Sequence, residues 1–306
     1  MSDCDGKIIN NGFDREPFSD IICGRKYCRK DAVGCPLCGQ KHKPRLLNVQ
    51  FEMKVMVAEC PSCRLAYQTP RPSVEACQAY MDMRWNSSDS YVRDIKEQQQ
   101  RAKKQMQYVK QVTSKTGRLL DFGAGIGTFV QTAMMEGWQA IGVERSSLAI
   151  NRAKEENGVE LYREVQGADY DVITLWDVVE HLQYPQEIFT KLRSLLCLGG
   201  YLIIETVNWE SWLRLTMGDR WNLYLFDHHF YFSPLSLREM VARCGLHNFT
   251  LLNTKPTPPI IRAFLHFGFN RSTWEGYRRA KKLWPTHYSY NVMVAAVQSS
   301  CCKAIK

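Results

Sequence analysis

The sequence predicts an α/β protein, with a mostly parallel seven-stranded sheet that carries helices on both faces and follows a small cysteine-rich module. Three observations support this expectation. From residue 118 onward, short apolar segments typical of buried strands alternate with segments of helical periodicity. A glycine-rich turn joins the first of these strands to the first of these helices. Two Cys-x-x-Cys pairs precede them, within residues 35–63.

The order of the elements divides the chain into three parts. Residues 1–34 are expected to be an N-terminal extension, residues 35–84 the module and residues 85–306 the main domain. Because ligands of parallel sheets bind beyond the carboxyl ends of the strands, we expect the site at that edge. Strands are expected at 118–122, 140–144, 159–162, 170–176, 201–207, 249–253 and 291–298, and helices at 92–112, 128–136, 148–156, 185–196 and 235–244.

Composition narrows the class of protein. Apolar residues make up 45% of the 306 residues, which is ordinary for a globular protein. No apolar run approaches the roughly 18 residues of a membrane span, and the N-terminus lacks a signal-peptide pattern, so we expect a cytoplasmic protein without a membrane span. Twelve cysteines in a chain of this length favour metal ligands and buried thiols over a disulfide framework.

The glycine-rich turn runs from Leu120 to Gly127 and reads L-D-F-G-A-G-I-G. A dinucleotide fingerprint would need glycine at position 128, where this chain has Thr128. The acid Asp121 stands two residues before the first glycine, an arrangement that suits a ligand with a cationic amino-acid end and no pyrophosphate. Glu144 ends the next strand, at the place where ribose hydroxyls are bound in such sheets.

Three stretches carry a resemblance to a known family. Residues 120–127, 176–182 (W-D-V-V-E-H-L) and 198–204 (L-G-G-Y-L-I-I) resemble the Rossmann-like class I methyltransferases of the group that includes the ubiquinone-biosynthesis O-methyltransferases. The resemblance implies S-adenosyl-L-methionine as the cofactor. The residues expected to bind it are Asp121, Gly123, Ala124, Gly125, Gly127, Glu144, Arg145, Asp177 and Val178.

Asp177, Glu180 and His181 form an acid-x-x-Glu-His run after the fourth strand. Ubiquinone O-methyltransferases carry a similar run that is associated with a divalent cation, so the resemblance implies a cation held by these three residues. The alternative is a polar pair at the start of a helix, which occurs in many methyltransferases that use no metal. Both interpretations remain open.

The two cysteine pairs, C-P-L-C-G at 35–39 and C-P-S-C at 60–63, are separated by 21 residues. Four thiolates at this spacing fit a closed tetrahedral structural zinc site in a zinc-ribbon-like module. The expected ligands are Cys35, Cys38, Cys60 and Cys63. Several methyltransferases of sugar and natural-product pathways resemble this layout, and so do some ribosomal-RNA methyltransferases.

The segment 220–234 is dense in aromatic residues and contains the adjacent His228 and His229. In class I methyltransferases the segment after the fifth strand lies over the transferred methyl group. Because the pKa of histidine lies near neutrality, we expect His228, His229 or His181 to act as a general base toward an acceptor hydroxyl. A structural role for His229 is the alternative, since the family often has a similar stretch that packs against the pocket.

The net charge of +9 is concentrated near the C-terminus, where residues 255–285 contain seven Lys or Arg and one acid. We expect this segment to be a basic aromatic insertion that suits an anionic partner, and the alternative is a solvated basic helix. Our first hypothesis is methyl transfer to oxygen or carbon of a small-molecule acceptor, such as a sugar or quinone-like metabolite, which is anionic or linked to a carrier. The alternatives are an RNA methyltransferase that grips nucleic acid with the module and the basic segment, and a cofactor-binding scaffold without activity.

Overall fold

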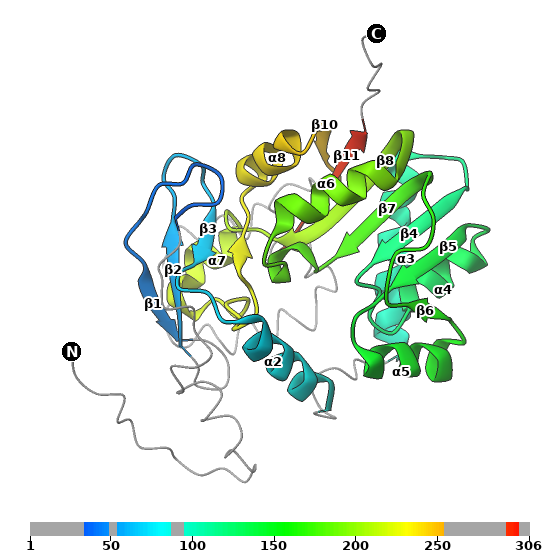
Figure 1. Ribbon diagram of the computed structural model, residues 1–306, viewed down its shortest axis with the longest axis horizontal. Helices are drawn as coiled ribbons and strands as arrows, with labels where there is room; N and C mark the ends of the chain where they lie inside the picture. Colours follow the sequence, from blue (N-terminus) through cyan, green and yellow to red (C-terminus); the bar gives the residue numbers. More distant parts are fainter. Residues whose placement is uncertain (1–33, 49–53, 87–94, 254–291, 300–306) are drawn as a thin grey trace.

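Two β-sheets organise the chain in the structure, a computed structural model that describes residues 34–48, 54–86, 95–253 and 292–299. The small sheet, which contains the first strands of the chain, and the large sheet lie side by side, as Figure 1 shows. The N-terminal extension, the basic segment 255–285 and residues 300–306 lie outside the described residues, apart from Gly34.

The large sheet has seven strands in the order β10-β11-β8-β7-β4-β5-β6. The five strands from β4 to β8 run parallel, and β11 lies antiparallel between β8 and β10. This confirms the predicted mostly parallel seven-stranded sheet. The chain order reverses at β4 and β7, so their carboxyl ends form the expected ligand site. The strands are β4 (Arg118–Phe122), β5 (Gln139–Val143), β6 (Leu161–Tyr162), β7 (Tyr170–Trp176), β8 (Leu196–Val207), β10 (Leu246–Leu251) and β11 (Val292–Ser299).

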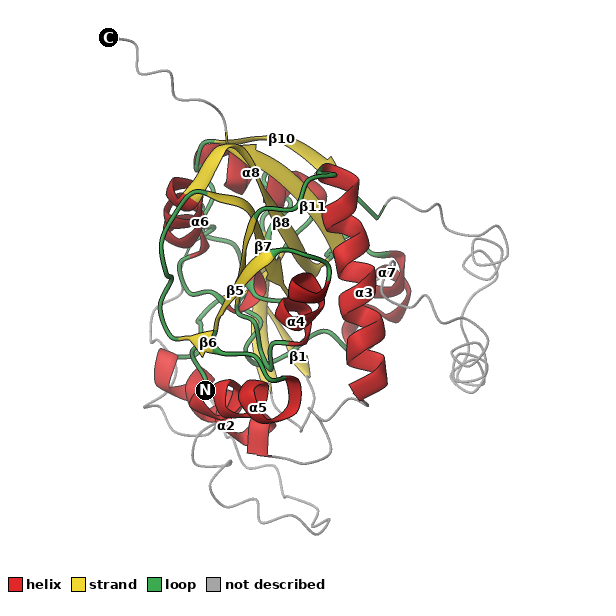
Figure 2. Ribbon diagram, turned by 90° about the vertical axis from the view of Figure 1, so that its right-hand side faces the viewer, coloured by secondary structure: helices red, strands yellow, loops and turns green. Residues whose placement is uncertain are grey.

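Helices cover both faces of this sheet, as predicted. Successive strand residues point to opposite faces, so Leu119 and Val172 enter one core while Leu120 and Ile173 enter the other. Figure 2 shows α3 and α4 on the first face. Side chains of α3, α4 and α5 contribute to the first core, and those of α6 and α8 contribute to the second. The helices are α3 (Ile95–Val112), α4 (Thr128–Met135), α5 (Ser147–Asn157), α6 (Pro185–Leu195) and α8 (Pro234–Arg243).

The small sheet joins the cysteine-rich module to the main domain. Its four antiparallel strands have the order β1-β2-β3-β9, and the fourth comes from the segment after β8. A cluster of aromatic side chains, including Trp209, Trp221 and Tyr224, packs with the apolar residues of this sheet. The strands are β1 (Arg45–Asn48), β2 (Lys54–Glu59), β3 (Ala66–Gln68) and β9 (Phe230–Tyr231), and the short helices α7 (Trp212–Met217) and η3 (Gly218–Arg220) lie between β8 and β9.

Several elements differ from the sequence expectation, among them α2 and β8. The helix α2 (Val74–Asn86) was not predicted, because its apolar residues are not gathered on one face. Strand β8 begins at Leu196, ahead of the strand expected at 201–207, so Leu198–Gly200 lies within it as an irregularity in its pairing with β7. A Cβ on Gly200 would lie 2.9 Å from the Tyr170 carbonyl oxygen, and glycine therefore permits this close approach.

None of the helices in the described part of the chain combines the length and the apolar character that crossing a bilayer requires.

Candidate functional site

The turn after β4 is shaped by glycines in the left-handed region. Gly123, Gly125 and Gly127 have φ of 83°, 56° and 75°, which residues with a side chain rarely adopt. A Cβ on Gly123 would lie 2.5 Å from Val178 Cγ2, whereas a Cβ on Gly125 would meet no atom within 4 Å. The turn therefore packs tightly against the residue after Asp177 on one side and leaves an open approach to its backbone at Gly125.

Asp121 lies just before this turn, at the carboxyl end of β4, and is 2% exposed. The Thr174 hydroxyl donates to its Oδ1 at 2.7 Å. Burial raises the pKa of Asp121 to about 7, and the neighbouring Glu144 carboxylate also raises it, while the Thr174 hydrogen bond and Arg101 lower it. A buried carboxylate that is costly to ionise alone is suited to a cationic ligand group, which would stabilise its charge.

Glu144, after β5, is held by three backbone N–H groups. Its Oε1 accepts from Arg145 and Ser146 at 2.7 and 2.9 Å, and its Oε2 accepts from Gly125 at 3.0 Å. The last bond joins the glycine turn to the end of the neighbouring strand. The Ala124 backbone N–H also joins the turn to this strand, since it donates to the Val143 carbonyl at 3.0 Å. The two loops thus form one rigid cradle.

A cavity of about 690 Å³ lies next to this cradle, lined by residues that follow β5 and β6 and by Gln78 of α2. Its wall is polar, and the exposed Arg145 belongs to it. The other lining residues are Ser146, Ser147, Leu148, Arg163 and Glu164. The cavity extends the cradle away from the end of β4, which gives room for an elongated ligand.

Three charged groups meet across the carboxyl ends of β7 and β8. Arg101 of α3 forms ion pairs with Asp177, at 2.5 Å, and with Glu205. Asp177 adopts a left-handed φ of 54°, and its N–H donates to the Glu205 carbonyl at 3.1 Å. The predicted cofactor residue Asp177 therefore lies at the switch point, and its partner is an arginine.

Glu180 and His181 belong to the 3-10 helix η2 (Val179–His181), beside the segment 225–229, which we call the histidine segment. His181 Nδ1 lies 3.1 Å from the Asp227 carbonyl oxygen and 3.2 Å from its Oδ2. Both are acceptors, so Nδ1 carries a proton, and in the neutral ring the lone pair is then on Nε2. The rings of His181 and His228 meet edge to face, with centroids 4.7 Å apart.

Glu180 is fully buried, and the Thr206 hydroxyl donates to its Oε2 at 2.8 Å. Burial raises the pKa of Glu180 to about 7; the Asp177 carboxylate raises it further, and His181 lowers it. Its Oε1 accepts no hydrogen bond from the described residues. Donor atoms of Glu180, His181 and His228 lie within 4.8 Å of one another. Among the described residues, the structure thus brings His228, rather than the expected Asp177, into this metal-ligating group.

His229 occupies a different environment from its neighbour. Its side chain is 1% exposed, and burial together with the nearby Arg71 guanidinium lowers the pKa of His229 to about 3. Gln183 Nε2 lies 2.9 Å from His229 Nε2, and because an amide nitrogen can only donate, this ring nitrogen accepts. Cys77 Sγ of α2 lies 3.6 Å from the same nitrogen. His229 is therefore neutral at physiological pH and is held between the module and η2.

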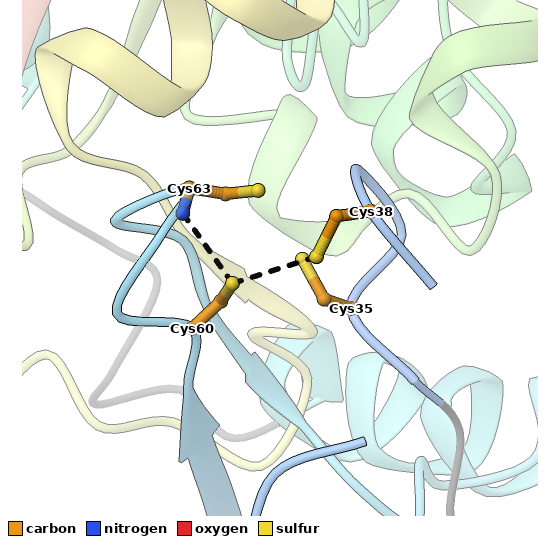
Figure 3. Close-up of side chains that lie close together, drawn as sticks. All are labelled: Cys35, Cys38, Cys60 and Cys63. Atoms are coloured by element: carbon orange, nitrogen blue, oxygen red, sulfur yellow. Dashed lines mark hydrogen bonds between the residues drawn. The ribbon is translucent and has the colours of Figure 1, made fainter. Parts of the chain in front are cut away.

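The four cysteines of the two pairs converge at one end of the small sheet, where Cys35 and Cys60 belong to the same core as the side chains of α6 and α8. Their sulfur atoms lie within 4.8 Å of one another, and Figure 3 shows the side chains of the two pairs facing each other. Cys38 Sγ and Cys60 Sγ are 3.6 Å apart. Burial raises the pKa of the Cys35 thiol to about 11, so a cation that binds these sulfurs would displace protons.

The two pairs share a local backbone geometry. The residue after the second cysteine, Gly39 or Arg64, has a left-handed φ of 76° or 57°, and its N–H donates to the carbonyl of the first cysteine. In the second pair the Cys63 N–H also points at Cys60 Sγ, at 3.4 Å. Each pair is therefore a tight knuckle that directs two sulfurs to one point, which suits a single tetrahedral ion.

Several residues that contact this constellation were not among those expected from the sequence. Asp227 precedes His228 directly and could have been singled out as a carboxylate beside two histidines. Arg101, Gln68, Gln183 and Cys77 carry no local signal, because their roles arise from contacts between distant segments. The predicted basic segment 255–285 lies outside the described residues, although the flanking Asn253 and Val292 lie at the carboxyl end of β8.

Comparison with known proteins gives a family-model match and a set of relatives. Residues 95–251 match the model of a methyltransferase domain. The ubiquinone biosynthesis O-methyltransferase of Acinetobacter baumannii is 26% identical over 149 residues, which cover 42% of this chain and 63% of the relative. That of Nitrosococcus oceani is 27% identical over 173 residues, which cover 49% and 73%. The chain thus spans less than two thirds of the length of the Acinetobacter relative.

Among solved structures, a SAM-dependent methyltransferase from Archaeoglobus fulgidus is similar with a TM-score of 0.48 and 16% identity, over 67% of this chain and 94% of the other. The phosphoethanolamine N-methyltransferase 2 of Haemonchus contortus, in complex with S-adenosyl-L-methionine, has a TM-score of 0.44 and 18% identity, over 65% of this chain and 53% of the other.

Proposed function

Since this chain belongs to the methyltransferase domain family, we propose that it transfers the methyl group of S-adenosylmethionine to an oxygen or carbon of a small-molecule acceptor. The observation that carries the proposal is the cradle at the switch point, where Gly125 is hydrogen-bonded to Glu144 and the buried Asp121 lies at the end of β4. The names of the Acinetobacter and Nitrosococcus relatives support an oxygen acceptor.

The cradle fits this cofactor group by group. Asp121 would receive the ammonium of the methionine end, and its buried carboxylate requires such a cation. The backbone at Gly125 is open to a close approach, and Glu144 would accept from a ribose hydroxyl through the Oε2 lone pair that its three N–H donors leave available. Arg145 and the polar cavity beside it would receive the nucleobase end. Gly123, Ala124, Gly127 and Val178 would shape the wall, and Asp177 would lie beside the methyl donor.

For the chemical step we assign the general base to His181. The bound cofactor supplies an electrophilic methyl group, and the protein must position the acceptor in line with it and take up the acceptor proton. The Asp227 carbonyl oxygen, 3.1 Å from Nδ1, fixes His181 with a proton on this nitrogen, and the Asp227 carboxylate, 3.2 Å away, would stabilise the imidazolium that forms. His181 is 26% exposed in its side chain, which leaves its ring accessible, whereas His228 and His229 are 4% and 1% exposed.

His228 and His229 then have supporting roles. His228 packs edge to face on His181 and restricts the orientation of its ring. His229 holds the histidine segment in place. Its backbone N–H donates to the Glu180 carbonyl at 2.7 Å, and its ring accepts a hydrogen bond from the Gln183 side chain. The low pKa of His229 supports this assignment, since a neutral buried imidazole can remain a constant structural acceptor across the physiological pH range.

A divalent cation is a second candidate for acceptor activation. Glu180, His181 and His228 offer one carboxylate oxygen and two imidazole nitrogens, and the buried Glu180 Oε1 accepts no hydrogen bond from the described residues. When bound, a cation would lower the pKa of an acceptor hydroxyl. The cation and base assignments are distinguishable, because only the first predicts that added Mg²⁺ or Mn²⁺ changes the rate.

The four cysteines support one structural zinc ion per chain. Four sulfurs that converge from two knuckles leave no position for substrate, so the ion would stabilise the module and take no part in the reaction.

The test is methyl transfer by the full chain to a panel of hydroxylated aromatic and sugar acceptors, detected as S-adenosylhomocysteine. For an acceptor that reacts, His181→Gln is expected to lower kcat by about 10²- to 10⁴-fold with little change in cofactor affinity. His247→Gln, at an exposed position of β10, is the matched control. If the His181→Gln variant binds the cofactor and its turnover is unchanged, the assignment of His181 as the base is wrong. If the wild-type chain does not bind the cofactor, the proposed methyl transfer is wrong.

A further inference from the structure

Strand β3 of the cysteine-rich module lies next to the histidine segment and forms hydrogen bonds with it at both ends. The Gln68 N–H, on β3, donates to the His229 carbonyl at 2.9 Å. The Gln68 side-chain amide donates to the carbonyls of Leu225 and Phe226 at 3.2 and 3.0 Å. One buried residue of the module therefore binds the first and last residues of the segment that contains Asp227 and His228.

The orientation of the Gln68 amide is fixed by its surroundings. The side chain is 1% exposed, and both acceptors are carbonyl oxygens, so a flipped amide would place oxygen against oxygen. The His228 N–H donates to the Leu225 carbonyl at 3.2 Å, which closes the segment as a turn around the Gln68 side chain. The side-chain amide of Gln68 thus donates to two carbonyls while the backbone N–H of the same residue donates to a third.

The opposite side of the histidine segment faces η2. There the His229 N–H donates to the Glu180 carbonyl and the His181 ring contacts Asp227. The segment is thus held between Gln68 on one side and the Glu180–His181 turn on the other. A shift on the Gln68 side would change the distance between the Asp227 carboxylate and His181 Nδ1.

We propose that Gln68 is a positioning residue that holds Asp227 against His181 and thereby makes the cysteine-rich module part of the active site. This inference rests on the proposed function, because it takes the Asp227–His181 pair as the base. The second cysteine knuckle is connected to Gln68 through the small sheet, since Cys60 directly follows β2, whose Val57 pairs with Gln68, and the Thr69 N–H donates to the Met56 carbonyl.

The first measurement is hydrogen exchange by mass spectrometry on the full, zinc-loaded chain, with Gln68→Met compared with the wild type. Methionine retains the length and the backbone N–H but removes both side-chain donors. We expect at least tenfold faster exchange in peptides that cover residues 225–230, with unchanged exchange in residues 118–127 and unchanged zinc content. Gln139→Met, at an exposed position of β5, is the matched control. Unchanged exchange in residues 225–230 would overturn the proposal.

The second measurement reports on His181 directly. In ¹⁵N-histidine-labelled protein, the wild-type His181 ring should give the fixed signal of the Nδ1–H tautomer, assigned by its loss in His181→Gln. We expect Gln68→Met to convert it to an averaged signal and to lower kcat at least tenfold with unchanged KM for S-adenosylmethionine. If Gln68→Met fails to fold, Gln68→Glu places a carboxylate against the same carbonyls, and the same averaged tautomer is expected.

The outcomes separate this inference from the proposed function. A wild type that shows the fixed tautomer but transfers no methyl group contradicts the function and leaves the positioning by Gln68 supported. A variant with faster exchange but an unchanged His181 signal and unchanged kcat overturns the positioning role and leaves the function supported.

Discussion

Asparagine at position 121 is expected to remove the pH dependence of S-adenosylmethionine binding. Burial raises the pKa of Asp121 to about 7, so only about 3% of it is ionised at pH 5.5 and about 75% at pH 7.5. The ammonium of the ligand, with an ordinary pKa of about 7.7, is almost fully protonated at pH 5.5 and about 60% protonated at pH 7.5. Because binding needs both charges, the affinity of the wild type should rise roughly 15-fold between these pH values.

Asp121→Asn retains the shape and the acceptor for the Thr174 hydroxyl but removes the charge. The lost charge-assisted hydrogen bond contributes about 1.5–3 kcal/mol, which corresponds to roughly 10- to 150-fold weaker binding at pH 7.5. Titration calorimetry at pH 5.5, 6.5 and 7.5 at constant ionic strength measures both effects. Asp169→Asn, at an exposed position, should bind like the wild type.

Either of two results would refute this reasoning. A wild-type Kd that stays constant from pH 5.5 to 7.5 would mean that Asp121 does not titrate in this range. An Asp121→Asn variant that keeps the 15-fold rise would mean that another group is responsible.

Two further variants test the cradle and the module. Gly123→Ala is expected to lower the free energy of unfolding by about 2 kcal/mol or more, because a left-handed φ costs a residue with a Cβ about 1–2 kcal/mol and the methyl group would contact Val178. Chemical denaturation should show a smaller loss for Gly125→Ala, which has the same strain without the contact, and equal losses would contradict the steric argument. Cys38→Ser is expected to lower the zinc content, measured by elemental analysis, from about one per chain to well below it. The matched change Cys197→Ser should leave the content unaltered, and zinc retained in Cys38→Ser would exclude a four-cysteine site.

The main domain could be predicted because its signals are local. The apolar strand Tyr170–Trp176 was predicted with its observed bounds, and the predicted helix at 128–136 ends one residue later than α4. The glycine turn was predictable for the same reason, because glycines in the sequence mark the positions where the backbone adopts a positive φ. Periodicity and turn chemistry act over a few residues, and a single sequence displays them directly.

Contacts between distant segments could not be predicted in this way. Pairing of Ala66 with Tyr231 depends on where the folded domain places residue 231, and no local pattern encodes it. The contact between His181 and Asp227 was unpredictable for the same reason, because it joins η2, which follows β7, to the histidine segment, which precedes β9. The sequence alone therefore could not rank the three histidines as candidate bases. Their burial and their partners in the structure distinguish His181 from the other two.

The β3–β9 pairing has a consequence for the biosynthesis of the chain. The module leaves the ribosome before the main domain, but its last strand partner is synthesised more than half of the chain later, because β3 pairs with Phe230 and Tyr231. Until then β3 is an open strand edge, which is a template for pairing with other chains. A nascent or truncated chain that ends before residue 230 would keep that edge exposed, so premature termination products of this protein are expected to aggregate even with the cysteine knuckles formed.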